Sequence, residues 1–318
     1  MMRCQCVLPW WLAGACLLLL FGARSFDSMA VGAFAFGLAA GRASKDWLVP
    51  VVGVLTTGAI LWLDRACGSP DSLAEAGVRL HATFDDFTAA APLAGLIGCA
   101  ALWFIIVPAG EALRRGPVDR GRSIMLGCLV PVAGVAVARA TLGGLVRDAG
   151  LGGWSVWQDV VAQFALPIGA VAAVGCGVGA LAAARSHRIA HWTAASAGGL
   201  FLIGVGRAND CALSAATWLM VAQVVFLTIW LPAQHAPGGP NRLLMVVGSV
   251  AAASLAGIWP LPGGATRWRL LNEVSSAGFG MAWDGLLLSA VILTWALAVA
   301  AWLPWVLRAM RDWRSLRA

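Results

Sequence analysis

Histidine and cysteine are the residues of this chain whose side chains could bind a metal or act as nucleophiles. His187 and His191 are four residues apart, which places both imidazoles on one face of a helix. The neighbouring Arg188 and the adjoining loop favour an interfacial position for this pair. Cys4-x-Cys6 is too short and isolated for a zinc or iron–sulfur site. We therefore predict no metal site.

The other cysteines and the glycine pattern near residue 175 also lack a catalytic context. Gly175, Gly177 and Gly179 lie inside an apolar stretch rather than a strand-turn-helix unit, so they indicate close helix packing. Five cysteines lie in apolar stretches, where a thiol is usually a small hydrophobic side chain. These are Cys16, Cys99, Cys128, Cys176 and Cys211. We expect no cofactor and no self-contained catalytic site, which leaves open a non-catalytic subunit of an NADH-quinone oxidoreductase-like complex.

The composition indicates that most of this chain lies in a lipid bilayer. Of its 318 residues 60% are hydrophobic and 12% are charged, and the mean hydropathy is +0.81. A soluble domain averages about 45–50% apolar and about 25% charged residues. The sequence therefore predicts an all-α, polytopic transmembrane bundle that contacts the bilayer.

Apolar segments long enough to cross the bilayer predict about ten transmembrane helices. They lie near residues 7–23, 28–41, 47–63, 89–108, 122–142, 159–184, 190–206, 211–232, 243–262 and 281–307. We interpret residues 1–25 as an uncleaved first span, because hydrophobic segments follow immediately. Pro131 and Gly134 predict that segment 122–142 is a broken helix.

Arginine clusters predict the orientation of the chain. Arg308, Arg311, Arg314 and Arg317 crowd residues 308–318, and cytoplasmic segments of bacterial membrane proteins collect such charges. We therefore expect a basic cytoplasmic tail and a location in the bacterial inner membrane. The net charge of +7 reflects topology rather than nucleic-acid binding, since no basic stripe is interleaved with exposed aromatics in a soluble segment.

Five separated stretches, in matching order, resemble one protein family. The most specific is SLAGIWPLPGGATRW at 254–268, which is similar to the family's SLAGIPPL-x-GF-x-SKW. The others are FDSM at 26–29, GSPDSLA at 68–74, the region 107–134 and the region 182–199 with RIAHWTAAS. The chain thus resembles the antiporter-like membrane subunits of respiratory complex I (NADH-quinone oxidoreductase subunits L, M and N) and of Mrp cation/proton antiporters.

The resemblance covers residues 26–307 and implies an antiporter-like domain with broken helices. The family usually has about fourteen helices, so the resemblance implies that this chain lacks most of the N-terminal ones and the last one or two. The family carries a row of ionisable groups through the membrane, where charges cost several kcal/mol and usually serve function. The resemblance aligns the family's glutamate with Asp27 and its terminal charge with Arg267. Between them, the first lysine aligns with Val132, the bridging histidine with Ala197 and the second lysine with Gln223.

The middle of this row has therefore lost its titratable groups. Valine and alanine cannot exchange protons, glutamine can only hydrogen-bond, and arginine stays protonated. The expected role is a degenerate, structural subunit that joins other membrane subunits in a complex related to complex I, Mrp antiporters or membrane-bound hydrogenases.

Alternatives remain at this point. Proton or cation translocation would use Asp27, Gln223 and Arg267, and an unrelated polytopic permease would use none of them. Asp27 could equally cap a helix at an interface. Arg267 could extend to the membrane surface, and Gln223 could bond a neighbouring helix.

Overall fold

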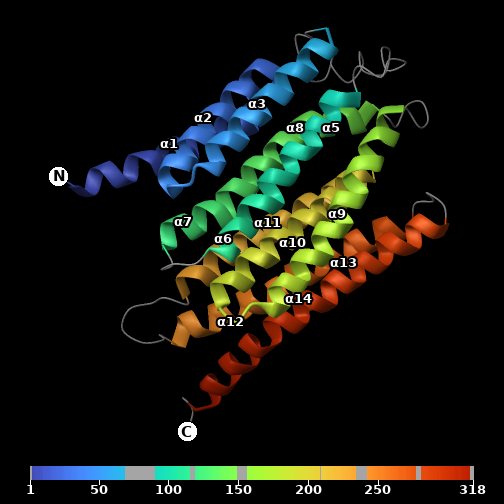
Figure 1. Cartoon of the computed structure of the whole chain (residues 1–318). Helices are drawn as coiled ribbons and strands as arrows, with labels where there is room; N and C mark the ends of the chain where they lie inside the picture. Colours follow the sequence, from blue (N-terminus) through green and yellow to red (C-terminus); the bar gives the residue numbers. More distant parts are fainter. Residues whose placement is uncertain are drawn as a thin grey trace.

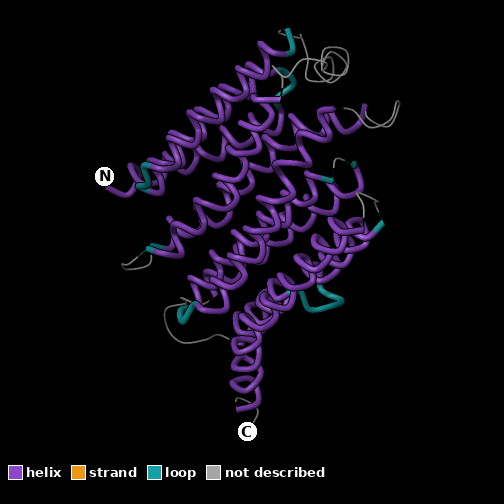
Figure 2. Tube along the Cα trace, turned by 45° about the vertical axis from the view of Figure 1, so that its right-hand side comes forward, coloured by secondary structure: helices purple, strands orange, loops and turns teal. Residues whose placement is uncertain are grey.

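The computed structural model describes residues 2–68, 90–114, 119–148, 156–207, 209–233, 242–276 and 281–315. All regular structure in these residues is helical (Figures 1 and 2), which confirms the predicted all-α class. The α-helices are α1 Met2–Gly22, α2 Phe26–Ser44, α3 Leu48–Ala66, α5 Ala90–Ala101, α6 Val107–Leu113, α7 Arg120–Ile124, α8 Val130–Asp148, α9 Val156–Ala182, α10 Ser186–Gly206, α11 Asp210–Ala233, α12 Arg242–Ala256, α13 Pro262–Ser275 and α14 Met281–Ser315. Most of the predicted stretch 68–74 lies outside the described residues.

Two π-helical turns make longer rods of four of these helices. The turn η1, Leu102–Ile106, joins α5 to α6, and the turn η2, Met125–Leu129, joins α7 to α8. With α12 and α13 counted as one interrupted rod, the described residues cross the bundle ten times. Seven of the described helical segments are long and apolar enough to span a membrane, and the apolar stretches Pro9–Gly22 and Val246–Ala256 are shorter.

Neighbouring rods run antiparallel, so the start of α1 and the end of α14 lie at the same end of the bundle (Figure 1). We call this the terminal end and the opposite one the far end. The first five rods, α1 to α8, and the last five, α9 to α14, each bring their first and fifth members into contact, α1 with α8 and α9 with α14. Because five is odd, the second group of five rods begins at the opposite end of the bundle from the first.

The predicted break in segment 122–142 is not where the structure has one. Residues 120–148 are helical throughout, and the backbone N–H of Val130 bonds to the Met125 carbonyl in the wider π-turn. This turn directly precedes Pro131 and accommodates a residue that has no N–H to donate. The predicted helix 243–262 is instead the interrupted one, ending at Ala256 and resuming at Pro262.

Two glycines bring α9 and α10 into backbone contact. A Cβ atom built on Gly199 would lie 2.7 Å from the Gly169 carbonyl oxygen and would collide with the Ala173 amide nitrogen. On Gly169, a Cβ would lie 2.7 Å from the Gly199 carbonyl oxygen. Small residues at such crossings allow close helix packing in membranes.

Cys67 and Cys211, both near the far end, differ in burial, and their reactivities test the packing around Cys67. Cys211 is exposed, whereas Cys67, just after α3, is buried, and burial together with the Asp64 charge raises the pKa of its thiol to about 12. Because the thiolate is the reactive form, we expect a maleimide at pH 8 to modify Cys67 at least about 100-fold more slowly than Cys211. Peptide mapping by mass spectrometry measures both rates. Equal rates would contradict the burial of Cys67.

Candidate functional site

Asp27 lies in the first turn of α2, at the far end of the bundle. Its side chain is exposed, and Ser25 caps the helix by accepting a bond from the Ser28 N–H at 3.3 Å. A carboxylate in the first turn is stabilised by the positive end of the helix dipole. The structure therefore places Asp27 at a helix start and away from the middle of the bundle.

Arg267 lies inside the bundle, at the interruption between α12 and α13. Its side chain is buried, and its Nη2 donates to the Leu255 carbonyl oxygen at 3.0 Å. A Cβ atom on Gly257, which has φ +82°, would collide with Arg267 Nη1. Within the described part of the chain, Nε and Nη1 of this arginine have no hydrogen-bond partner. The guanidinium thus fills the break instead of extending to the membrane surface.

Gln223 and Ala197 occupy matching levels on neighbouring antiparallel helices. A Cβ on Gly204 of α10 would meet the Ala216 Cβ of α11. Seven residues back along α10 and seven onward along α11, which is two turns on each, place Ala197 opposite Gln223. Both side chains are buried, and Gln223 Nε2 has no partner among the described residues. The third lost position, Val132, is half-buried near the start of α8.

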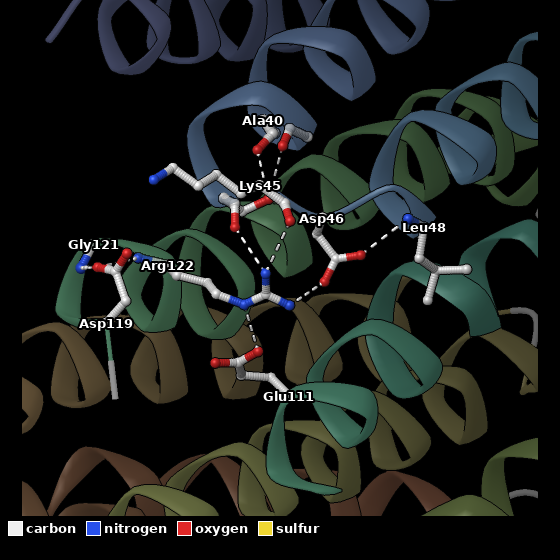
Figure 3. A network of polar contacts seen from close by, with 10 residues as sticks. Ala40, Lys45, Asp46, Leu48, Glu111, Asp119, Gly121 and Arg122 are labelled. Carbon is white, nitrogen blue, oxygen red and sulfur yellow. Dashed lines mark hydrogen bonds and ion pairs between the residues drawn. The ribbon is translucent and has the colours of Figure 1, made fainter. Parts of the chain in front are cut away.

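A buried ionic network lies near the terminal end of the bundle and joins three segments of the chain (Figure 3). Arg122 of α7 donates from Nε to Glu111 of α6 at 2.7 Å and from Nη2 to Asp46. Its Nη1 donates to the carbonyl oxygens of Ser44 and Lys45, at 2.9 and 3.1 Å. The guanidinium thereby ties the α2–α3 turn to α6 and α7. The Lys45 backbone in this turn is left-handed, with φ 54°.

The sequence alone did not reveal this network, because Arg122 lies close to Arg114, Arg115 and Arg120 in a basic stretch that is typical of a cytoplasmic loop. Its partners come from two other parts of the chain, 76 residues away for Asp46 and 11 for Glu111. One sequence feature could have indicated an ion pair here: Glu111 is an acidic residue that immediately follows an apolar span.

His191 is buried rather than interfacial, which corrects the prediction for this residue. The imidazole lies against the π-turn η2, since a Cβ on Gly127 would be 3.1 Å from His191 Nδ1. Neither ring nitrogen has a partner among the described residues. His187, one turn nearer the helix start, is only half-buried. In the described residues, no group of three His, Cys, Asp or Glu side chains could hold a metal.

Acidic residues in the described chain all lie near helix ends or in the turns between helices. At the far end, Arg207 and Asp284 form an ion pair at 3.1 Å. The acidic residues are Asp27, Asp46, Asp64, Glu111, Asp119, Asp148, Asp159, Asp210, Glu273, Asp284 and Asp312. The single lysine of the sequence, Lys45, occupies the α2–α3 turn. Within the described chain, the middle of the bundle therefore holds no carboxylate and no lysine.

Comparison with known proteins places the fold. The chain is similar to a chain of the Mrp complex from Dietzia sp. DQ12-45-1b, with a TM-score of 0.61 over 92% of its length and 16% sequence identity. The fold is therefore like that of this Mrp complex chain. The match covers 58% of that longer chain. No protein-family model and no curated protein sequence matches.

Proposed function

We propose that this chain is an antiporter-like membrane subunit with a structural role, and that it does not move ions by itself. One observation carries the proposal. The chain has a fold like that of the Mrp complex chain, but among the described residues the middle of its bundle contains neither a carboxylate nor a lysine. Proton transfer needs groups that bind and release a proton near neutral pH. Gln223 and Arg267, the polar residues at the family's row positions, cannot do so.

We further propose that the terminal end faces the cytoplasm of a bacterial cell and that the chain assembles with other membrane subunits. Basic residues near the terminal end outnumber those near the far end, which supports this orientation. Those near the terminal end include Arg42, Lys45, Arg114, Arg120, Arg122, Arg185, Arg188, Arg242, Arg308, Arg311 and Arg314, while those near the far end include Arg24, Arg65, Arg147, Arg207 and Arg269. The helix α14 continues to Ser315, so the proposed cytoplasmic tail begins as helix.

Ion translocation through Asp27, Gln223 and Arg267 is the second candidate. The observation that favours it is the buried N–H groups of Gln223 and Arg267 that lack partners in the described chain. Ordered water commonly satisfies such groups. The exposed position of Asp27 at a helix start argues against a continuous path.

Reconstitution separates the two candidates. Proteoliposomes that contain the purified chain alone should lose an imposed pH gradient at the rate of empty liposomes, and Asp27→Asn should not alter that rate. A protonophore added at the end verifies that a gradient was present. Faster loss that Gln223→Leu or Arg267→Met abolishes would refute the structural role and support translocation.

A further inference from the structure

The break between α12 and α13 lies near the middle of the bundle's thickness. Since α12 has 15 residues from Arg242, the break begins about 22 Å from the terminal end. Trp295, whose Nε1 donates to the Gly257 carbonyl oxygen at 2.9 Å, is near the centre of the candidate span Asp284–Arg308. Residues 257–261 are therefore non-helical backbone at the depth of the hydrocarbon.

Some backbone groups of this break have no hydrogen-bond partner in the described chain. Hydrogen bonds within the chain use the N–H groups of Gly257, Ile258 and Leu261. Among the described residues, none reaches the Trp259 N–H or the carbonyl oxygens of Trp259 and Pro260. Trp259 is 62% exposed and Pro260 is also exposed. Lipid tails cannot bond these groups, and each unsatisfied group costs several kcal/mol in hydrocarbon.

The surface around the break has the character of a protein interface. Trp259, Trp268 and Trp295 line an open pocket of about 440 Å³. Tryptophans that face lipid usually lie at the membrane–water boundary, whereas Trp259 and Trp295 lie at mid-depth. Large aromatic side chains are, however, enriched where proteins bind one another. Arg267 fills the inner side of the break, so an occupant can approach only from outside.

We propose that a transmembrane helix of a partner subunit covers the α12–α13 break and packs into the pocket formed by these three tryptophans. This inference rests on the proposed role as a subunit of a membrane complex. The partner helix carries a hydroxyl or amide side chain opposite Trp259, because such groups both donate and accept hydrogen bonds. A second copy of this chain would bring two carbonyls and only one N–H to the contact, which leaves carbonyls without donors.

Photo-crosslinking in native membranes tests the proposal. The full chain carries p-benzoylphenylalanine in place of Trp259 or, as a matched control, in place of Val171. Val171 is 75% exposed near the middle of the uninterrupted helix α9. We expect a light-dependent adduct of defined mass from position 259 and none from position 171. Peptide mapping should locate the crosslink in a transmembrane segment of a different protein, next to a hydroxyl or amide residue.

A second step tests the chemistry of the contact. Replacing that partner residue with leucine should reduce co-purification of the partner at least about tenfold, while both proteins keep their elution volumes in detergent. A lipid adduct, an adduct with a second copy or no adduct above the control would overturn the proposal. Ion flux in proteoliposomes would instead refute the structural role, so the two failures are distinguishable.

Discussion

Replacing Arg122 with methionine is expected to lower the free energy of unfolding by about 3–5 kcal/mol. The substitution leaves the carboxylates of Glu111 and Asp46 in a largely buried site without their cation, and it leaves the Ser44 and Lys45 carbonyl oxygens without a donor. Denaturant unfolding in mild detergent, followed by tryptophan fluorescence, measures the loss.

Two further variants show whether the lost energy comes from buried charge. Arg185→Met removes an exposed arginine near the same end, so its expected effect is within about 0.5 kcal/mol. Combining Arg122→Met with Asp46→Asn and Glu111→Gln removes the unpaired charges and should restore more than half of the loss. An Arg122→Met protein as stable as the parent would contradict the network.

Gly199→Val is expected to prevent α9 and α10 from packing. The new side chain would meet the Ala173 and Gly169 backbone, which cannot rotate away as a side chain can. Overpacking a core lowers the free energy of unfolding by about 1–3 kcal/mol, and we expect a collision with backbone atoms to cost at least the upper value. We expect most of this variant to aggregate on size-exclusion chromatography in detergent.

The matched control lies on one of the same two helices. Gly175→Val introduces the same side chain on α9, where a Cβ has nothing within 4 Å. This variant should elute with the parent protein and unfold at a similar temperature. If the two variants elute alike, the backbone contact between Gly169 and Gly199 is not a determinant of the fold.

The amino-acid sequence was sufficient for the class of fold because that depends on long apolar runs. It also singled out Arg267, since the motif around 254–268 resembles a segment of known architecture. It put the broken helix at Pro131, however, because a proline shows that one hydrogen bond is missing but not how the backbone adapts. A π-turn and a complete break satisfy that local condition equally.

The buried polar groups were harder to predict, for a different reason. Arg122 is one of several arginines in a basic loop, and its role depends on Asp46, which is distant in the sequence. His191 fits inside the bundle because Gly127 of another helical segment leaves room for its ring. Helical periodicity describes one helix at a time, so it carries no information about such pairs.

The sequence distance spanned by Arg122 also bears on how the protein is made. Its guanidinium binds a turn that left the ribosome 76–78 residues earlier. At ordinary rates of synthesis, about 5–20 residues per second, the turn waits several seconds for its donor. During that interval the membrane surface must hydrate the Ser44 and Lys45 carbonyls, so α2 and α3 form a hairpin that is inserted but not yet fixed. When α7 is synthesised, Arg122 binds this turn, so the helices assemble in the order in which they are translated.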